Sequence, residues 1–414
     1  MELKIIEESV FEQFVKSHPY GTFLQSLEEK KVKEWNGEKC YLLGLYQKKE
    51  LIGVTMLIEI PARFHKNIYY APRGFVTDYQ NKKYVESFTK ELYQFAKSNN
   101  GLEFIIDPYI IYQIYDKDEK VIEHHEEMIT YLKKLGYHHY GFNQNFETSQ
   151  VRFMYRIPVY ETLQEMVSTF SKSTRKRIEE VHQKGVKVRV ATKKDLPLVV
   201  ELLKASAENK HFEYRSLEYY QTMMDSFKKQ LTIYIAFIQF DDYLKETKRL
   251  LEETNKEYDK LEEEMSKVNV GSKLLKKKEL LLNHRKKYEE EIKQIQEYQK
   301  QYGKEKAIGA LVSMRSHNEY ITLSSGMLSE FREFNPKYAM YEAHMKDAVK
   351  EKFEYVNFYG ISGNLDPKSE LYGIYGLKKG YNGNIVELIG EFSYPVSKLY
   401  TPYHTLLKLK DKIK

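Results

Sequence analysis

The sequence predicts an α/β fold that consists of a duplicated strand-and-helix unit and an inserted antiparallel coiled-coil arm. A strand followed by a helix is expected near residue 3 and again near residue 186, and an apolar hairpin follows each. The heptad-patterned segment 241–305 lies between the strands of the second hairpin. A chain of 414 residues with 42% hydrophobic residues is long enough for two or three such parts with real cores.

The first half begins with a short strand and a helix in residues 3–18. Its hairpin spans residues 40–60, where two apolar runs are joined by a polar turn from Gln47 to Glu50. A further strand and an amphipathic helix are expected next, and a last strand then ends at Asp107. This order of elements defines the repeated unit.

The second half repeats that order. Residues 186–190 alternate valine with basic residues, as in a half-buried strand, and Asp195 is placed to cap the following helix. The strands of the second hairpin are expected at residues 231–238 and 307–314, and the last strand at residues 353–362. The chain therefore looks like two copies of one α/β unit.

The arm is predicted from two heptad limbs around Gly271. At 1.5 Å per residue, a limb of about 27 residues reaches ~40 Å from the body. Residues 241–267 hold ten acidic and six basic side chains, whereas residues 273–305 hold ten basic and six acidic ones. The repeat positions are Leu244, Leu251, Tyr258 and Met265, with Thr247, Thr254, Leu261 and Val268 three further on, then Leu274, Leu281, Tyr288, Ile295 and Tyr302.

Two interpretations of the arm are open. In one, its charges only solvate the hairpin and pair across the seam. In the other, a basic tip lies along a nucleic-acid backbone. The lysines near the tip are Lys267, Lys273, Lys276, Lys277 and Lys278.

Composition favours a cytoplasmic protein. The formal net charge of +6 permits a polyanionic partner without requiring one. The single cysteine, Cys40, fits a reducing compartment. We see no signal peptide at the N-terminus, and the most apolar stretch, residues 51–60, is far shorter than the ~20 residues that span a bilayer. Peripheral contact with the inner face of a membrane is compatible with these features.

The domain boundaries follow from the elements. We expect residues 1–150 to form the first subdomain and residues 151–240 with 306–395 the second. The arm is residues 241–305, and the tail 396–414 is expected to pack back on the body. A substrate cleft is expected to run between the subdomains.

The repeated unit resembles the fold of N-acetyltransferases. Such enzymes hold coenzyme A in a glycine-containing loop that opens a helix. Neither residues 71–81 nor residues 324–335 have the expected glycine spacing, so an acetyl-coenzyme A enzyme is disfavoured. No nucleophile context or metal-ligand cluster stands out, and the histidine pairs 124–125 and 138–139 lack carboxylates at ligand spacing.

Four stretches carry a family resemblance. In chain order they are YAPRGFVTDY, FSKSTRKRIEEVHQKGVKVRV, NFYGISG and LKKGYNGNIVELIGEF. They resemble the Fem family of tRNA-dependent aminoacyltransferases that build peptidoglycan interpeptide bridges. The resemblance runs from about residue 20 to 396 and includes the arm.

The resemblance implies a reaction and its partners. The amino acid of an aminoacyl-tRNA would be transferred to the stem-peptide side-chain amine of a UDP-linked or lipid-linked muropeptide precursor. The tRNA ester is already activated, so neither a cofactor nor a metal is expected. Such an enzyme has to hold two polyanions and orient an amine, which calls for lysine and arginine around the site.

Two catalytic residues are implied. Lys378 follows Leu377 where the family has a phenylalanine, and it is expected to stabilise charge at the tRNA end. The surrounding stretch predicts a strand, so Lys379 is expected on the opposite face, in solvent. Asp107 aligns with a family aspartate near the acceptor amine, and as a partly exposed carboxylate it is expected to position the amine more than to act as a base.

Two binding groups are also implied. Lys33, Arg215 and Tyr219 are expected to bind the diphosphate-sugar part of the precursor, with Arg215 and Tyr219 four residues apart on one helix face. For Arg215 a surface ion pair with Glu213 or Glu218 is the alternative. The expected tRNA-binding residues, for which a solvated face is the alternative, are Lys172, Arg175, Lys176 and Arg177.

Two other functions are compatible with the sequence. One is a non-catalytic nucleic-acid-binding protein in which the arm and the cluster at residues 172–177 are the binding elements. The other is an acetyltransferase with an altered coenzyme A loop. Turnover with charged tRNA and a muropeptide separates all three.

Overall fold

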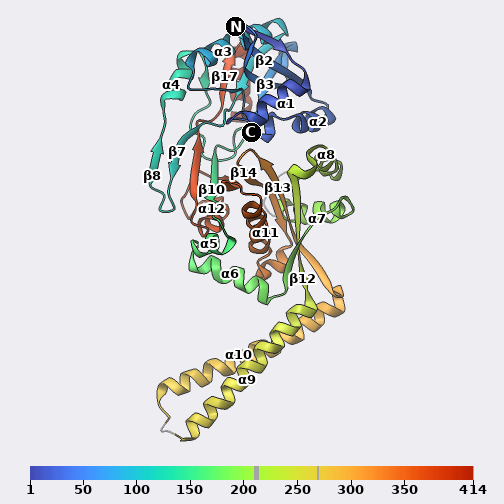
Figure 1. Cartoon of the computed structure of the whole chain (residues 1–414), viewed down its shortest axis with the longest axis vertical. Helices are drawn as coiled ribbons and strands as arrows, with labels where there is room; N and C mark the ends of the chain where they lie inside the picture. Colours follow the sequence, from blue (N-terminus) through green and yellow to red (C-terminus); the bar gives the residue numbers. More distant parts are fainter. Residues whose placement is uncertain (209–213, 268–269, 414) are drawn as a thin grey trace.

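The computed structural model describes residues 1–208, 214–267 and 270–413 of the chain. Figure 1 shows a body in which two sheet-containing parts lie one above the other, with a long helical arm projecting from the lower part. Within the described residues, none of the helices combines the length and apolar character that a membrane span requires.

The upper part contains an eight-stranded mixed sheet in the order β1-β2-β3-β4-β6-β17-β9, with β5 paired to β3. β4 and β6 are parallel, because α3 connects them as a crossover. Its strands are β1 (Glu2–Ile5), β2 (Lys39–Gln47), β3 (Glu50–Pro61), β4 (Asn67–Ala71), β5 (Val76–Thr77), β6 (Gly101–Ile106), β9 (His138–His139) and β17 (Phe392–Pro395).

Helices cover both faces of this sheet. Phe11 of α1 packs on one face with Leu42 and Val54, whereas Phe88 of α3 packs on the other with Leu43. The alternation of Leu42 and Leu43 between two cores is what a strand covered on both faces requires. The helices of this part are α1 (Glu8–Ser17), α2 (Leu27–Trp35), α3 (Lys82–Ser98) and α4 (Glu127–Lys134).

The lower part contains a nine-stranded sheet in the order β11-β12-β13-β14-β15-β10-β16-β7-β8. Its strands are β7 (Ile111–Tyr115), β8 (Val121–His124), β10 (Phe153–Pro158), β11 (Val186–Val190), β12 (Leu231–Gln239), β13 (Glu305–Ser316), β14 (Glu319–Met327), β15 (Tyr355–Ile361) and β16 (Asn384–Leu388). Its helices are α5 (Leu163–Ser168), α6 (Lys172–Gln183), α7 (Leu196–Glu208), α8 (Leu217–Phe227), α11 (Pro336–Lys350) and α12 (Tyr372–Lys379).

The predicted duplication is confirmed. Apart from the short strand β5 in the first half and the arm in the second, the order β1-α1-α2-β2-β3-β4-α3-β6 recurs as β11-α7-α8-β12-β13-β14-α11-β15. In both copies the hairpin is antiparallel, and the strand before the crossover helix is parallel to the strand after it. The two halves also exchange strands: β7 pairs with β16 of the second sheet and β8 with β7, whereas β17 pairs with β6 of the first sheet. The divisions expected at residues 150 and 395 therefore do not coincide with the division between the sheets.

The arm is the expected antiparallel helix pair. α9 (Phe240–Lys267) continues directly from β12, and α10 (Ser272–Tyr302) returns to β13. The side chains buried in its seam include Thr247, Leu261 and Ile295. At the tip, Lys277 pairs with Glu257 at 3.1 Å and Lys278 with Glu262 at 2.6 Å. These ion pairs favour the interpretation in which the charges of the arm only solvate the hairpin and pair across its seam. Val268, which belongs to the predicted repeat, lies outside the described residues.

The C-terminal helix α13 (Tyr400–Ile413) contacts the first sheet. The Tyr400 hydroxyl is 2.8 Å from the Ser393 hydroxyl of β17, and His404 Nε2 is 3.0 Å from the carboxylate of Glu103. These contacts hold the start of the tail against the body.

Candidate functional site

Lys378 lies on a helix, so the predicted strand is wrong at this point. α12 places Lys378 and Lys379 in its last turn, with Gly380 as the C-cap residue. Successive helix residues point about 100° apart, so the two lysines still diverge. Lys378 is buried, with 6% of its surface exposed, whereas Lys379 forms an ion pair with Glu119 at 2.6 Å. Lys379 thus faces the turn between β7 and β8 and stays partly exposed to solvent.

The Lys378 ammonium sits on an irregular stretch of β15. Its Nζ donates to the carbonyl oxygens of Phe358 at 2.6 Å, Tyr359 at 3.3 Å and Gly360 at 2.7 Å. The pairing of β15 with β10 shifts register here, and Tyr359 has a left-handed backbone with φ 55°. The three donors of an ammonium match these three acceptors, so Lys378 stabilises the bulge.

Asp107 is buried, not partly exposed as expected. It follows β6, and only 2% of its surface is accessible. Its carboxylate accepts the backbone N–H of Arg73 at 2.6 Å and the hydroxyl of Tyr70 at 2.9 Å, and Arg73 Nη1 lies 3.9 Å away. Burial raises the pKa of Asp107 to about 6, although Arg73 opposes the shift.

Arg73 links Asp107 to the second sheet. Its Nη2 donates to the carbonyl of Val151 at 2.6 Å, two residues before β10 begins. A Cβ added at Gly360 would lie 2.7 Å from Val151 Cγ1, so this segment packs against the bulge that Lys378 holds. Burial raises the pKa of Tyr359, while the charge of Arg73 lowers it, which places the two side chains within electrostatic range. Asp107 and Lys378 are thus brought to one junction between the sheets.

Sequence reasoning did not single out Arg73 and Tyr359. Arg73 lies in YAPRGFVTDY and Tyr359 in NFYGISG, two of the motifs that carry the family resemblance. Their place in these motifs was the sequence signal that could have pointed to a functional role. Both have positive φ, which is uncommon for residues with a side chain and is often found at functional sites.

Lys33, Arg215 and Tyr219 come together where α2 packs on α8. The Arg215 guanidinium lies 5.3 Å from the centre of the Tyr219 ring. Arg215 is not within the helix as expected, because Ser216 caps α8 by accepting the N–H of Tyr219. Its alternative partner Glu213 lies outside the described residues.

Acidic residues accompany this group. Lys33 Nζ is 3.3 Å from the carboxylate of Glu38 and 4.0 Å from that of Glu29. Burial raises the pKa of Glu29 to about 7, while Lys33 and Arg215 act in the opposite direction. We refer to Lys33, Arg215, Tyr219 and Glu29 as the α2–α8 group.

The cluster at residues 172–177 is exposed at the start of α6. Arg175 donates to the carbonyl of Ser168 at 3.1 Å, Arg177 to Asn335 at 3.0 Å, and Lys176 pairs with Glu180 at 3.7 Å. The backbone N–H of Ser171 donates to the Gly380 carbonyl at 2.9 Å, which fixes α6 to the end of α12. A Cβ at Gly380 would collide with Thr174 Oγ1, so this close approach needs glycine.

The groups flank the junction. Figure 1 shows α2 and α8 on one flank of the body and α5, α6 and α12 on the other. Within residues 1–208, 214–267 and 270–413, no group of three or more His, Cys, Asp and Glu side chains is placed to hold a metal ion. Cationic side chains thus lie on both flanks of the body, whereas Arg73, Asp107 and Lys378 are buried.

The duplicated α/β halves define a fold of two tandem acetyltransferase-like subdomains. A sequence profile described as the FemAB family matches residues 6–408. The chain belongs to this family, which confirms the resemblance read from the four motifs.

Individual relatives agree with that assignment. The chain is 28% identical over 409 residues to the aminoacyltransferase FemA of Staphylococcus aureus strain MRSA252, with 97% of each chain covered. The identity to FemA of strain MW2 is the same, with the same coverage. The crystal structure of FemX superimposes with a TM-score of 0.77 at 23% identity over 98% of this chain and 100% of that one. That likeness confirms the fold.

Proposed function

We propose that this FemAB-family aminoacyltransferase moves the amino acid of an aminoacyl-tRNA onto the stem-peptide side-chain amine of a peptidoglycan precursor, which builds the interpeptide bridge. The observation that carries the proposal is the family match over residues 6–408 in a chain in which three of the four motifs supply residues to one junction. YAPRGFVTDY supplies Arg73, NFYGISG supplies Tyr359, and LKKGYNGNIVELIGEF supplies Lys378.

The reaction needs positioning more than an activated nucleophile. The neutral amine attacks the ester carbonyl, and the carbon–oxygen bond to the tRNA 3′ oxygen then breaks. The proton lost by the amine ends on that departing oxygen, so no co-reactant is consumed. An amine has a solution pKa near 10.4, so the protein has to favour its neutral form beside the ester.

Lys378 stabilises the negative charge that develops on the ester oxygens. In the structure its three N–H donors are directed at carbonyls, of which the Tyr359 contact is the longest at 3.3 Å. Exchange of this contact for the developing oxyanion would make the stabilisation specific to the transition state.

Asp107 has a positioning role. Both its oxygens already accept hydrogen bonds, from Arg73 and Tyr70, and its side chain is 3% exposed. It therefore holds Arg73 against Val151 and keeps the junction in shape. Proton removal by Asp107 would first require those contacts to break.

The two flanks bind the two substrates. Lys33, Arg215 and Tyr219 bind the diphosphate and sugar of a UDP-linked or lipid-linked precursor. The tRNA backbone lies on Lys172, Arg175, Lys176 and Arg177. Aminoacyl-tRNA is a cytoplasmic substrate, so we place the protein in the cytoplasm, with peripheral contact at the inner membrane face when the precursor is lipid-linked.

The test is turnover by the purified full chain. A panel of charged tRNAs is incubated with nucleotide-linked and lipid-linked muropeptide, and the products are weighed by mass spectrometry. The expected product is heavier than the precursor by one amino-acid residue. Binding of tRNA without that product would leave a nucleic-acid-binding protein, and transfer of acetyl from acetyl-coenzyme A would indicate an acetyltransferase.

A further inference from the structure

Five strand ends of the first sheet form a continuous rim. Strands β2, β4 and β6 begin there, whereas β3 and β17 end there. Neighbouring strands lie ~4.8 Å apart, so their paired ends lie side by side. The residues that pair at this edge, in the order of the strands, are Lys39, Glu59, Pro61, Asn67, Gly101, Glu103 and Pro395. We refer to these strand ends, together with the β3–β4 turn at residues 62–66, as the first-sheet rim.

The β3–β4 turn presents a phenylalanine to solvent. Phe64 is 44% exposed although its backbone is left-handed, with φ 61°, and the next residue, His65, has φ 53°. Bulky residues rarely adopt this conformation, and such strain clusters at functional sites. The turn is held in place, since the Ala62 N–H donates to the Lys66 carbonyl at 2.8 Å and the Lys66 ammonium to Asn100 Oδ1 at 2.6 Å.

Helix α13 lies beside this turn and is apolar on the side that faces away from the sheet. Burial raises the pKa of Tyr403 and the charge of Arg63 opposes the shift, so the helix and the turn are within electrostatic range. His404 faces the sheet, where it contacts β6. Leu406 and Leu409, by contrast, are 41% and 51% exposed. Positions 402, 406 and 409 follow each other at spacings of four and three, so these apolar residues form one strip.

The tail that contains this strip is cationic. Residues 396–414 hold five lysines, a single aspartate and no glutamate. At 3.6 residues per turn, positions 408 and 412 lie on one side of the apolar strip and position 410 lies on the other. All three are lysines. Basic residues beside an apolar face are typical of helices that lie in a membrane surface.

Two carboxylates at the rim are already engaged. Glu59 accepts hydrogen bonds from the Tyr41 hydroxyl at 2.6 Å and from Asn67 at 3.1 Å. Glu103 is fully buried beneath α13, where His404 Nε2 lies 3.0 Å from it, and burial raises its pKa to about 7. Neither carboxylate therefore does much to offset the cations of the rim and of α13.

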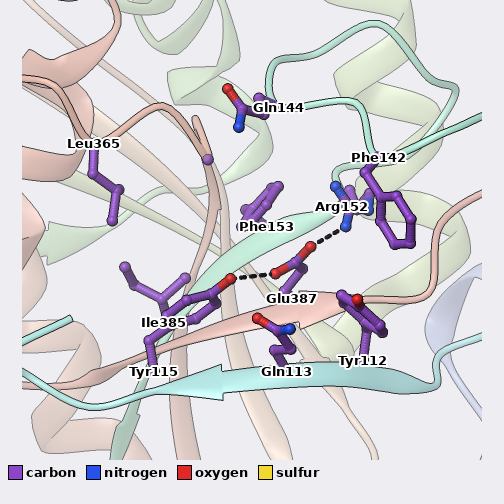
Figure 2. A pocket seen from close by; sticks show the side chains of 11 residues that line it. Tyr112, Gln113, Tyr115, Phe142, Gln144, Arg152, Phe153, Leu365, Ile385 and Glu387 are labelled. Carbon is purple, nitrogen blue, oxygen red and sulfur yellow. Dashed lines mark hydrogen bonds and ion pairs between the residues drawn. The ribbon is translucent and has the colours of Figure 1, made fainter. Parts of the chain in front are cut away.

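Two cavities in the described part of the chain are unsuited to a long hydrocarbon chain. The one in Figure 2, of about 230 Å³, has the Arg152–Glu387 ion pair and the Gln144 amide in its wall. Another, of about 260 Å³ near α1, is lined in part by Lys16 and Arg315. Both are smaller than the ~300–1,000 Å³ of pockets for drug-sized ligands. This favours an enzyme that meets a lipid-linked substrate at the membrane surface.

The rim also lies beside the α2–α8 group. Glu38, whose carboxylate is 3.3 Å from Lys33 Nζ, directly precedes Lys39, the first residue of β2. Trp35 at the end of α2 is 47% exposed, and tryptophan is enriched where proteins meet the membrane–water interface. A bilayer along the rim would therefore have its surface close to the residues that are proposed to bind the diphosphate.

Taking the proposed function as its basis, we propose that the first-sheet rim and α13 dock on an anionic lipid bilayer and so bring the enzyme to a lipid-linked precursor. Phe64, Leu406 and Leu409 enter the interface, and the lysines of the tail contact lipid phosphates. The diphosphate of the precursor lies at the same surface, next to the α2–α8 group. A nucleic-acid backbone would attract the same lysines but would gain little from exposed leucines.

The test is co-sedimentation of the purified full chain with lipid vesicles. One set consists of phosphatidylcholine alone, and the other of phosphatidylcholine mixed with phosphatidylglycerol. The wild-type chain is expected to bind the mixed vesicles and not the neutral ones, and added salt should weaken this binding because it screens the lysines.

Two variants remove apolar groups, and a third is their control. Leu406→Gln/Leu409→Gln should weaken binding to mixed vesicles about tenfold, since two apolar side chains leave the interface. Phe64→Asn should also weaken it, while its melting temperature should equal or exceed that of wild type, because asparagine tolerates a left-handed backbone. Val121→Gln/Ile122→Gln changes two equally exposed residues on β8 and should bind as wild type does.

Lysine variants and turnover complete the test. Lys408→Gln/Lys412→Gln should weaken binding to mixed vesicles about 25-fold, or about fivefold per lysine. With lipid-linked precursor in the mixed vesicles, kcat/KM should fall in the leucine and lysine variants. With soluble nucleotide-linked precursor it should stay at the wild-type value, since neither pair belongs to the α2–α8 group or the junction.

The outcomes separate this inference from the proposed function. A wild-type chain that binds neither vesicle, or leucine variants that bind mixed vesicles as wild type does, would overturn the docking surface and leave the proposed function intact. Lysine variants that lose tRNA but keep vesicle binding would assign these lysines to nucleic acid and likewise overturn it. Vesicle binding that the variants abolish, without turnover of any charged tRNA, would reject the proposed function and keep the surface.

Discussion

The two halves of this chain share one order of elements and differ where the equivalent strands β6 and β15 end. β6 leads into Asp107, a carboxylate held by Arg73 and Tyr70. β15 ends in a bulge whose carbonyls are held by the Lys378 ammonium. One copy of the unit thus presents a buried negative charge to the junction, and the other presents a buried positive charge.

This difference shows how a duplicated fold can make one asymmetric site. The equivalent helices α2 and α8 pack together, and each contributes to the α2–α8 group. The equivalent hairpins also differ, because two residues separate β2 from β3, whereas α9 and α10 separate β12 from β13. Each of these differences between the two halves can be tested with a variant.

The largest effect is expected from Lys378→Met. It removes the positive charge at the end of β15, and kcat should fall about 10²–10³-fold, as is typical for the loss of one stabilising donor at a transition state. The affinity for tRNA should change far less. Three carbonyls also lose their donor, so the melting temperature should fall, and kcat is measured well below it.

Lys379→Met is the matched control on the same helix. Its ion pair with Glu119 is partly exposed, and such pairs contribute about 0–1 kcal/mol, so activity and stability should stay close to wild type. If both lysine variants lose kcat equally, a specific role for Lys378 is rejected. Lys378→Arg retains the positive charge and the hydrogen-bond donors. If this variant has a wild-type melting temperature but a low kcat, Lys378 has a role in catalysis that is distinct from its stabilisation of the bulge.

The sequence predicted the parts of the fold that depend on local pattern. The two hairpins, the last strands and the heptad arm all follow from apolar periodicity. The strand exchange by β7, β8 and β17 could not be predicted, because pairing between distant segments leaves no local signature. Lys378 was predicted in a strand because its neighbours are apolar and aromatic, yet Tyr375 and Lys378, three apart, form the buried face of a short helix.

The candidate site also has one part that the sequence predicted and one part that it did not. Lys33, Arg215 and Tyr219 were expected together and lie together, because the helices that carry them pack on each other. The burial of Asp107 and the roles of Arg73 and Tyr359 depend on how the two sheets meet. Their left-handed backbones are enforced by that packing and cannot be read from residue type.

The next largest effect is expected from Arg215→Ala, which removes the cation beside Tyr219 in the α2–α8 group. The KM for muropeptide should rise by the equivalent of roughly 1.5–3 kcal/mol, since a charge-assisted contact to phosphate is lost while the reacting groups stay in place. Steady-state kinetics with saturating charged tRNA measures it. An unchanged KM with a lower melting temperature would support the surface ion-pair interpretation.

A smaller, pH-dependent effect is expected from Glu29, beside Lys33. Its pKa of about 7 means that it is largely neutral at pH 6 and charged at pH 8. Precursor affinity should therefore weaken about fivefold over that range, because one nearby negative charge opposes phosphate by about 1 kcal/mol.

Glu29→Gln should bind the precursor with a flat pH profile at the strength that wild type shows at pH 6. The raised pKa also predicts that the folded state loses stability as the pH rises from about 4.5 to 7, and that Gln removes this slope. A wild-type profile that is already flat would show that the Glu29 carboxylate does not act on the precursor.

The smallest effect on the body is expected when residues 241–305 are replaced by a two-residue turn like that between β2 and β3. β12 and β13 pair along their length, and the pairs that remain run from Leu231 with Met314 to Ile238 with Lys306, so the strands still meet where a short turn can close them. The shortened chain should melt cooperatively, since hairpins close readily through short turns. Buried contacts at the base of the arm, such as Phe240 stacked on Tyr298 at 5.7 Å, will be lost, and a modest fall in melting temperature is expected.

Binding of tRNA tests what the arm contacts. Weaker binding of full-length tRNA with unchanged binding of a short acceptor-stem RNA would assign the arm to a distant part of the tRNA. An insoluble product, or a broad melt, would show that the second half has come to depend on its insertion, and that the two hairpins are no longer equivalent.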